Sequence, residues 1–214
     1  MRRGIRVKAF VIVSLALYAV QPVFPARAEK SIFIVSFTGG TVTLIREGRE
    51  HRFLHPSDIP KGGIQLQEAD TVQTAAGVFA ELQVKPGRVS VHIAENTSLV
   101  VENIKNSGNI LVFSLVYGRV RAVQKGRANT ILVKAGLSIV EMQKGNVNID
   151  NIIVPDVPYE SQPVIYISTL SGTAVFIPSF TDQPTERIKL NKKETFIFYT
   201  GEGRFERWIM NKDI

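Results

Sequence analysis

Histidines are the first residues to consider for chemistry, because the chain has only three of them and no cysteine. His51 and His55 are four residues apart, and two side chains at that spacing share one face of a strand, where they could hold a metal ion. No third imidazole lies close in the sequence, and Pro56 turns the chain away. We therefore expect an exposed loop pair, predict no metal and no cofactor, and expect binding to survive alanine substitution of all three histidines.

Signatures of catalysis are sparse. The chain has no Gly-x-Ser-x-Gly elbow and no cysteine nucleophile. Gly201-Glu202-Gly203 lacks the third glycine and the preceding βαβ unit of a nucleotide-binding loop. We predict no catalytic residues and no enzymatic activity. Glycoside hydrolysis needs two carboxylates about 5–9 Å apart, which sequence does not place, so a secreted carbohydrate-active enzyme on a β scaffold stays open as an alternative.

Two arginines are candidates for binding a partner. Arg119 and Arg121 alternate with Val120 and Ala122, so they are predicted to point outward from one strand. Arginines held on a rigid sheet can pair with carboxylates or phosphates of a partner. The alternative is a solvated strand face or an edge guarded by charge.

The C-terminal part of the chain is rich in aromatic residues. These are Phe196, Phe198, Tyr199, Phe205 and Trp208. Some must pack into the core, and those left exposed would form a docking surface, because aromatic residues dominate interface energetics. We take Phe205 and Trp208 as candidate partner-binding residues.

The charge of the chain is concentrated at its start. The 214 residues carry 26 Lys and Arg against 19 Asp and Glu, but five of the basic residues and no acidic one lie within 1–28. The rest therefore holds 21 basic against 19 acidic residues. Neutralising phosphates requires clustered excess charge, so a nucleic-acid partner is not expected.

The first 28 residues have the organisation of a secretory signal peptide. A basic segment at Met1–Lys8 precedes an apolar run at Ala9–Val20, and Ala26-Arg27-Ala28 supplies the cleavage pattern. A helix of twelve residues spans about 18 Å, less than the roughly 30 Å of a bilayer core. We predict cleavage after Ala28 and no membrane span thereafter, with an uncleaved anchor as the alternative. The expected location is the periplasm or exterior of a bacterium.

Alternating apolar and polar residues predict strands along the remaining chain. In Val78–Val84 the apolar side chains fall on one face and Glu81 and Gln83 on the other, and His92 is expected to face solvent or a neighbouring strand. The predicted strands are Ile32–Phe37, Thr41–Arg46, Arg49–Leu54, Ile64–Gln67, Val78–Val84, Arg88–Ile93, Ser98–Ile104, Ile110–Tyr117, Arg119–Val123, Thr130–Lys134, Leu137–Met142, Val147–Ile149, Val164–Ser168, Thr173–Ile177, Arg187–Leu190 and Glu194–Tyr199.

Many short strands joined by polar turns predict an all-β fold. One short helix is expected at Gly203–Asn211. Three prolines fall within Val154–Pro163, which favours a connector there. This divides the chain into a β domain at 29–153, a connector at 154–163 and a small β appendage at 164–214. The alternative is one continuous stack of strands in which 154–163 is a long loop.

A series of short motifs follows along the chain: Gly40-Thr41-Val42, a turn at Gln67-Glu68-Ala69-Asp70-Thr71-Val72-Gln73-Thr74, Ala80-Glu81-Leu82 with Gly87-Arg88-Val89, Asn96-Thr97-Ser98-Leu99, Leu115-Val116-Tyr117-Gly118-Arg119-Val120-Arg121, and Leu170-Ser171-Gly172-Thr173-Ala174-Val175. Their order resembles the FecR-like domain, a bacterial periplasmic β module. The resemblance implies a solenoid-like β roll of stacked short strands that relays binding signals in the cell envelope. Signalling members of the family also carry a cytoplasmic region that contacts a sigma factor.

Even with an uncleaved leader, only Met1–Lys8 could lie in the cytoplasm, and eight residues are too few to fold into a sigma-binding domain. We therefore expect a freestanding exported module that acts in binding or as a scaffold, without catalysis. Its expected partner is an envelope protein or a cell-wall glycan. A periplasmic carrier of lipid or lipopolysaccharide is a further alternative, and it would require a continuous apolar groove.

Overall fold

The computed structural model describes residues 30–103, 109–126, 129–153, 163–178 and 186–209. The predicted signal peptide, all of the predicted connector except Pro163, and residues 210–214 lie outside them. The predicted all-β class is confirmed, since the described elements are fifteen strands and one short 3-10 turn. Within the described residues no helix has the length and apolar character needed to cross a bilayer.

The strands keep the bounds that the alternation predicted in most places. In chain order they are β1 (Ser31–Phe37), β2 (Val42–Arg46), β3 (Arg49–Phe53), then the turn η1 (Pro56–Asp58), β4 (Ile64–Leu66), β5 (Thr71–Thr74), β6 (Ala80–Lys85), β7 (Val89–Ile93), β8 (Thr97–Asn103), β9 (Ile110–Gln124), β10 (Thr130–Ala135), β11 (Ser138–Ile153), β12 (Pro163–Ile177), β13 (Ile188–Leu190), β14 (Glu194–Tyr199) and β15 (Arg204–Ile209).

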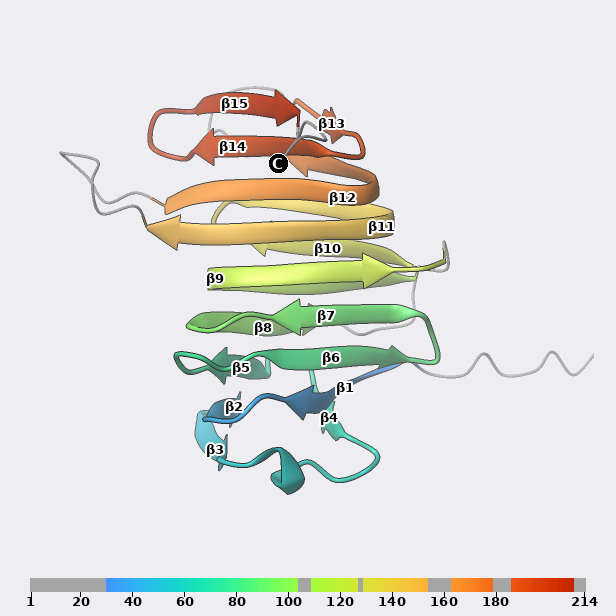
Figure 1. Cartoon of the computed structure of the whole chain (residues 1–214), viewed down its shortest axis with the longest axis vertical. Helices are drawn as coiled ribbons and strands as arrows, with labels where there is room; N and C mark the ends of the chain where they lie inside the picture. Colours follow the sequence, from blue (N-terminus) through green and yellow to red (C-terminus); the bar gives the residue numbers. More distant parts are fainter. Residues whose placement is uncertain (1–29, 104–108, 127–128, 154–162, 179–185, 210–214) are drawn as a thin grey trace, which may run out of the picture.

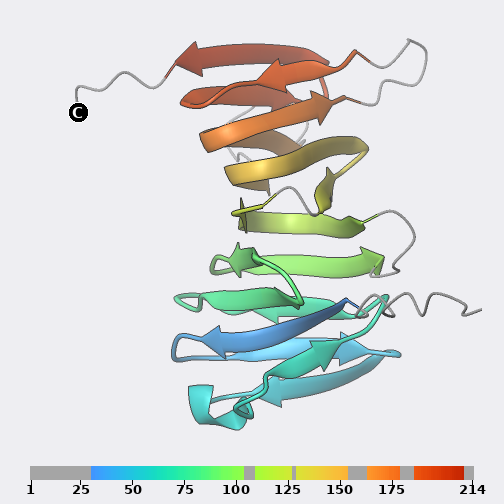
Figure 2. The same cartoon turned by 90° about the vertical axis from the view of Figure 1, so that its right-hand side faces the viewer.

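All strands belong to one hydrogen-bonded sheet that is folded into two layers. The first layer runs β4-β1-β6-β7 and continues through halves of β9, β11 and β12 to β14 and β15. The second runs β3-β2-β5-β8 and continues through the other halves of β9, β11 and β12, with β10 and β13. Figure 1 shows the strands stacked along the long axis, with β5, β8 and β10 behind the first layer. Figure 2 shows the same stack from the side.

Three long strands pass from one layer to the other, and sequence analysis had divided each of them in two. β9 pairs with β8 and β10 up to Tyr117 and with β7 and β11 from Gly118 onward. Gly118 has a φ of +97°, and a Cβ there would lie 2.3 Å from the Thr97 hydroxyl. Only glycine fits both the backbone angle and the close approach.

β11 and β12 cross between the layers side by side. Gly145 of β11 pairs with Gly172 of β12, and a Cβ at either glycine would lie 2.1 Å from a carbonyl oxygen of the neighbouring strand. The residues predicted as a turn at Lys144-Gly145-Asn146 are therefore the corner of one continuous strand. Glycine and polar residues favour a corner and a turn equally, so local sequence does not separate them.

The core fills the space between the two layers. Inward-facing residues alternate with outward ones in both layers, as in Ile32 and Ile34 of β1, or Leu111 and Phe113 of β9. One cluster of buried side chains extends from Ile32 to Phe198. Burial of one face is what the period-2 alternation predicted.

The C-terminal strands continue the same sheet. β12 pairs with β11 from Ile177 back to Pro163, and Phe176 and Phe196 belong to the common core cluster. The division of the chain into domains remains a prediction, but the strand pairing has no break at this point.

Two predictions about individual elements are wrong. A helix was expected at Gly203–Asn211, but in the described part of this segment Arg204–Ile209 is β15, which pairs with β14 from Glu194 to Tyr199. An isolated short segment has weak preferences, and pairing with an existing strand edge decided its conformation. Thr71–Thr74, where no strand was predicted, is β5, between β2 and β8.

Candidate functional site

The outward side chains of the first layer form rows across neighbouring strands. One row, which we call the outer row, is traced by the pairing register from β1 to β15. Its members, in order from β1 to β15, are Ser36, Glu81, His92, Arg121, Asn148, Ser168, Thr195 and Trp208. Directly opposed side chains on one face are close enough to act together on a ligand.

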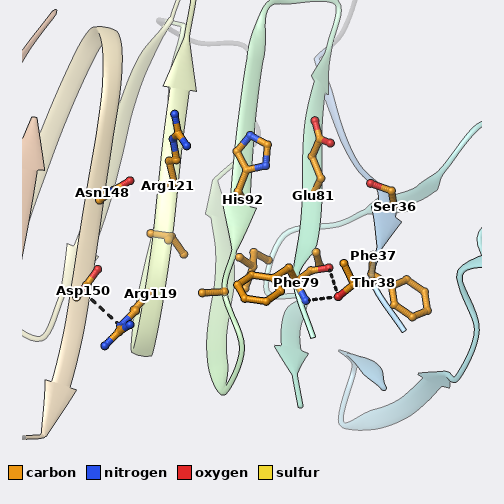
Figure 3. Close-up of a pocket in the computed structure, with 14 residues that line it drawn as sticks. Ser36, Phe37, Thr38, Phe79, Glu81, His92, Arg119, Arg121, Asn148 and Asp150 are labelled. Carbon is orange, nitrogen blue, oxygen red and sulfur yellow. Dashed lines mark hydrogen bonds and ion pairs between the residues drawn. The ribbon is translucent and has the colours of Figure 1, made fainter. Parts of the chain in front are cut away.

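A depression of about 620 Å³ lies over the first half of this row. Figure 3 shows its lining, with Arg121, His92 and Glu81 side by side and Arg119 and Phe79 in the neighbouring row. Ala94, which follows β7, lies in this neighbouring row between Arg119 and Phe79, and its backbone N–H donates to the Arg119 carbonyl at 3.0 Å. A methyl group between two large side chains leaves the space that forms the hollow.

Arg119 is neutralised within the site. Its Nε lies 3.3 Å from Oδ2 of Asp150, the residue opposite it on β11. Burial raises the pKa of the Asp150 carboxyl, and the charge of Arg119 partly offsets this rise. This pair therefore has little free charge to offer a ligand.

Arg121 is held differently, by a neutral group. Its Nε donates to the Asn146 amide oxygen at 2.8 Å, and no carboxylate of the described residues lies within ion-pair distance of it. His92, its directly opposed neighbour, contacts the Ser90 hydroxyl at 3.3 Å. Both side chains are exposed. The guanidinium is thus oriented, charged and open to an incoming anion.

The side of the depression near β1 is fixed by polar contacts. Gln83 donates to the Glu81 carboxylate at 3.2 Å. The Phe79 N–H donates to the Thr38 hydroxyl, and the Thr38 N–H donates to the Phe79 carbonyl, each at 2.8 Å. These bonds position the exposed Phe79 ring at the rim, where it can contact an apolar group next to the arginines.

The four predicted partner-binding residues are divided between three places. Arg119 and Arg121 lie together in the depression, as their alternation indicated. Trp208 is on the same outer face but at the far end of the outer row. Phe205 has the opposite orientation, and its ring stacks on buried Phe196 with 5.2 Å between centroids.

The histidine pair lies away from the depression. Both are exposed as expected, but the loop position is wrong for His51, which is on β3, while His55 precedes η1. Among the described residues, no three His, Cys, Asp or Glu side chains gather where a metal could bind.

Sequence reasoning missed Phe79, Ala94, Asn146 and Asp150 as parts of the site. Alternation along each strand had already placed Glu81 and His92 outward. The four missed residues join the site through contacts with residues of other strands. The register between strands brings them together, and no local pattern reports it.

Comparisons with known proteins give a likeness of fold. Neither a family model nor a curated protein matches the sequence. Two crystal structures of a putative anti-sigma factor from Parabacteroides distasonis superpose with TM-scores of 0.50 at 15% and 14% identity, over 65% of this chain. The match covers 59% of that protein's length. At this identity the chain is similar to those structures in fold.

Proposed function

We propose that this chain is an exported, non-enzymatic FecR-like module that binds a partner protein in the bacterial cell envelope. Its binding surface is the depression on the outer face of the first layer. The observation that carries the proposal is Arg121, an exposed guanidinium oriented by the neutral Asn146 and lacking an acidic partner among the described residues.

The partner's contacting group is a carboxylate. Arg119 already has Asp150, so Arg121 supplies the free charge, and Phe79 supplies apolar area elsewhere in the same depression. A charge-assisted bond on a rigid sheet gives both orientation and affinity. The predicted cleavable leader and the likeness of fold to a putative anti-sigma factor support a role in relaying an envelope signal.

The spacing of the acidic residues disfavours the enzymatic alternative. Glu81 on β6 and Asp150 on β11 are the two carboxylates of the depression, with β7 and β9 between them. Three strand spacings amount to about 14 Å. Glycosidase pairs lie about 5–9.5 Å apart, so these two do not fit that chemistry.

The packing between the layers disfavours the lipid carrier. A carrier needs an apolar groove that an acyl chain can enter. Here the apolar faces of both layers are turned inward and are filled by side chains such as Phe113, Phe176 and Leu82, all essentially inaccessible to solvent. The outer row is mostly polar.

Photo-crosslinking in the native envelope tests the proposal. A photoreactive amino acid replaces His92, whose imidazole is not expected to be needed for binding. We expect one adduct with an envelope protein, reduced roughly tenfold by Arg121→Gln, because hydrogen bonds to charged groups contribute about 1.5–3 kcal/mol. Arg49→Gln, at another exposed arginine, on β3, is the matched control and should leave the adduct unchanged.

Three results would count against the proposal. An adduct insensitive to Arg121→Gln would remove the arginine from the interface. Retention by purified wall sacculi, without any protein adduct, would replace the protein partner by a glycan. Fractionation that leaves the protein in the cytoplasm, with residues 1–28 uncleaved, would contradict export.

A further inference from the structure

The C-terminal end of the first layer is an unprotected strand edge. β15 pairs with β14 on one side and with no other strand of the described residues. Its large apolar side chains are unusually exposed: Phe205 at 49%, Trp208 at 59% and Ile209 at 70%. Unpaired backbone groups beside apolar side chains form a template for another strand.

The hydrophobic core also continues into this edge. Phe176 contacts Phe196 with 5.0 Å between ring centroids, and Phe196 stacks on Phe205 at 5.2 Å. Phe205 is the last ring of this series and is half-exposed. The aromatic core therefore ends at a surface where a further apolar layer would bury it.

The charges of β15 are already used within the chain. Arg207 donates to the Glu194 carboxylate at 2.9 Å and also to the Lys189 carbonyl. Arg204 bonds both Glu202 and Glu206. An occupant of the edge therefore meets an internally neutralised strand, which favours an apolar partner over a strongly charged one.

We propose that the occupant is the β15 strand of a second copy, paired antiparallel about a two-fold axis at Arg207. The arrangement of β15 around this residue is self-complementary. Phe205 and Ile209 stand two residues before and after it, so each Phe205 lies opposite the Ile209 of the other copy. Glu206 and Trp208 are opposed in the same way on the outer face.

This pairing extends the core across the interface. Phe205 and Ile209 are on the same face of β15 as the buried Phe196 side, because alternate residues share a face. Both copies contribute the pair, as a two-fold interface requires. The opposed Arg207 side chains each keep Glu194 as counter-ion, which reduces their repulsion.

Analytical ultracentrifugation of the exported protein tests for the dimer. We expect a concentration-dependent dimer that Ile209→Lys weakens by roughly tenfold or more, because truncating or charging a central apolar contact has effects of this size. Leu137→Lys is the control, since Leu137 is 75% exposed but lies far from β15, in the β10–β11 turn. A monomer at all concentrations, or equal effects of both variants, overturns the proposal.

Single cysteines test the register, since the natural chain has none. Directly opposed residues of an antiparallel pair have Cα atoms about 4.5–5.5 Å apart, within the range for a disulfide. Arg207→Cys should therefore crosslink two chains under mild oxidation. Phe205→Cys places the two sulfurs about 14 Å apart along the strands, at 3.4 Å per residue, and should not. Equal crosslinking by both variants, or by neither, contradicts the two-fold at Arg207.

Discussion

The two ends of the strand stack differ in the side chains that their edge strands expose. At the N-terminal end, β3 presents four consecutive exposed residues, Arg49, Glu50, His51 and Arg52, of which three are charged. At the C-terminal end, β15 presents Phe205, Trp208 and Ile209. β15 also carries three charged residues, so charge alone does not distinguish the two ends. The difference is that β3 has no large exposed apolar side chain, whereas β15 has three, and exposed apolar residues on an edge favour pairing with another strand.

The N-terminal end is also closed over the core. The segment from β3 through η1 to β4 brings Phe53, Ile59 and Ile64 against the core cluster. Arg46 and the buried Asp70 fix this end, with Arg46 Nη2 2.5 Å and Nε 2.9 Å from the Asp70 carboxylate. Asp70 also accepts the Gln67 N–H at 2.7 Å. A terminal unit of a stack needs such a cap.

The largest expected effect concerns this ion pair. Asp70→Ala should lower the free energy of unfolding by about 3 kcal/mol, because it leaves the Gln67 N–H without its acceptor and removes the counter-ion of Arg46. Glu194→Ala breaks the corresponding pair at the C-terminal end, where Arg207 is exposed, and should cost below about 1 kcal/mol. Urea denaturation measures both, and equal losses would contradict the difference between the ends.

The second effect compares two glycines with similar backbone angles. Gly48 of the β2–β3 turn has a φ of +74° and open space around it, whereas Gly172 of the β12 corner has +78° and a carbonyl oxygen 2.1 Å from a would-be Cβ. Gly48→Ala should cost about 1 kcal/mol from the left-handed backbone alone. Gly172→Ala should cost about 1–3 kcal/mol more from crowding. Thermal unfolding of the two variants separates the effect of backbone strain from that of steric crowding. Similar melting temperatures would contradict the close contact at Gly172.

The third prediction converts the protected edge into an open one. Replacing His51 and Arg52 by valine should leave stability within about 0.5 kcal/mol, since both side chains are exposed. The variant should nevertheless self-associate, because β3 then exposes two β-branched apolar side chains and carries one charge fewer. Light scattering against protein concentration reports this as species larger than those of the unmodified chain, with Lys61→Val as control. A variant with the same assembly state as the unmodified chain would mean that His51 and Arg52 do not protect β3.

The smallest effect is in acid. Backbone N–H groups of His55 and Leu54 lower the pKa of Asp58 at one end, and the Asn191 N–H followed by the charge of Arg207 lowers that of Glu194 at the other. Each contributes stability above its unfolded pKa that is lost as pH falls through its folded pKa. The pKa of Asp150 is raised in the folded protein, so ionisation of this carboxyl lowers the stability of the fold as pH rises above its unfolded pKa. NMR titration of the carboxyl carbon shifts should show lowered pKa values for Asp58 and Glu194 and a raised pKa for Asp150. A raised pKa for Asp58 would contradict the prediction.

The sequence predicted which face of a strand each side chain occupies better than it predicted which strands are adjacent. Arg119 and Arg121 were placed outward correctly because side-chain direction depends only on a residue's position along its own strand. The Asp150 partner of Arg119 lies 31 positions later, and no local pattern indicates that β9 and β11 are adjacent. The helix expected at Gly203–Asn211 failed for the same reason, since pairing with β14 overrode a weak local preference.

By itself, the sequence determined the β class and the inward or outward direction of most side chains, because the period of two is a property of the extended backbone. Tertiary structure decided that Gly118, Gly145 and Gly172 are corners within strands, since their close contacts come from other strands. It also decided that residues 204–209 form a strand, which puts Phe205 and Trp208 on opposite faces, and that Arg121 has no acidic partner among the described residues. Those outcomes depend on register, which long-range packing sets.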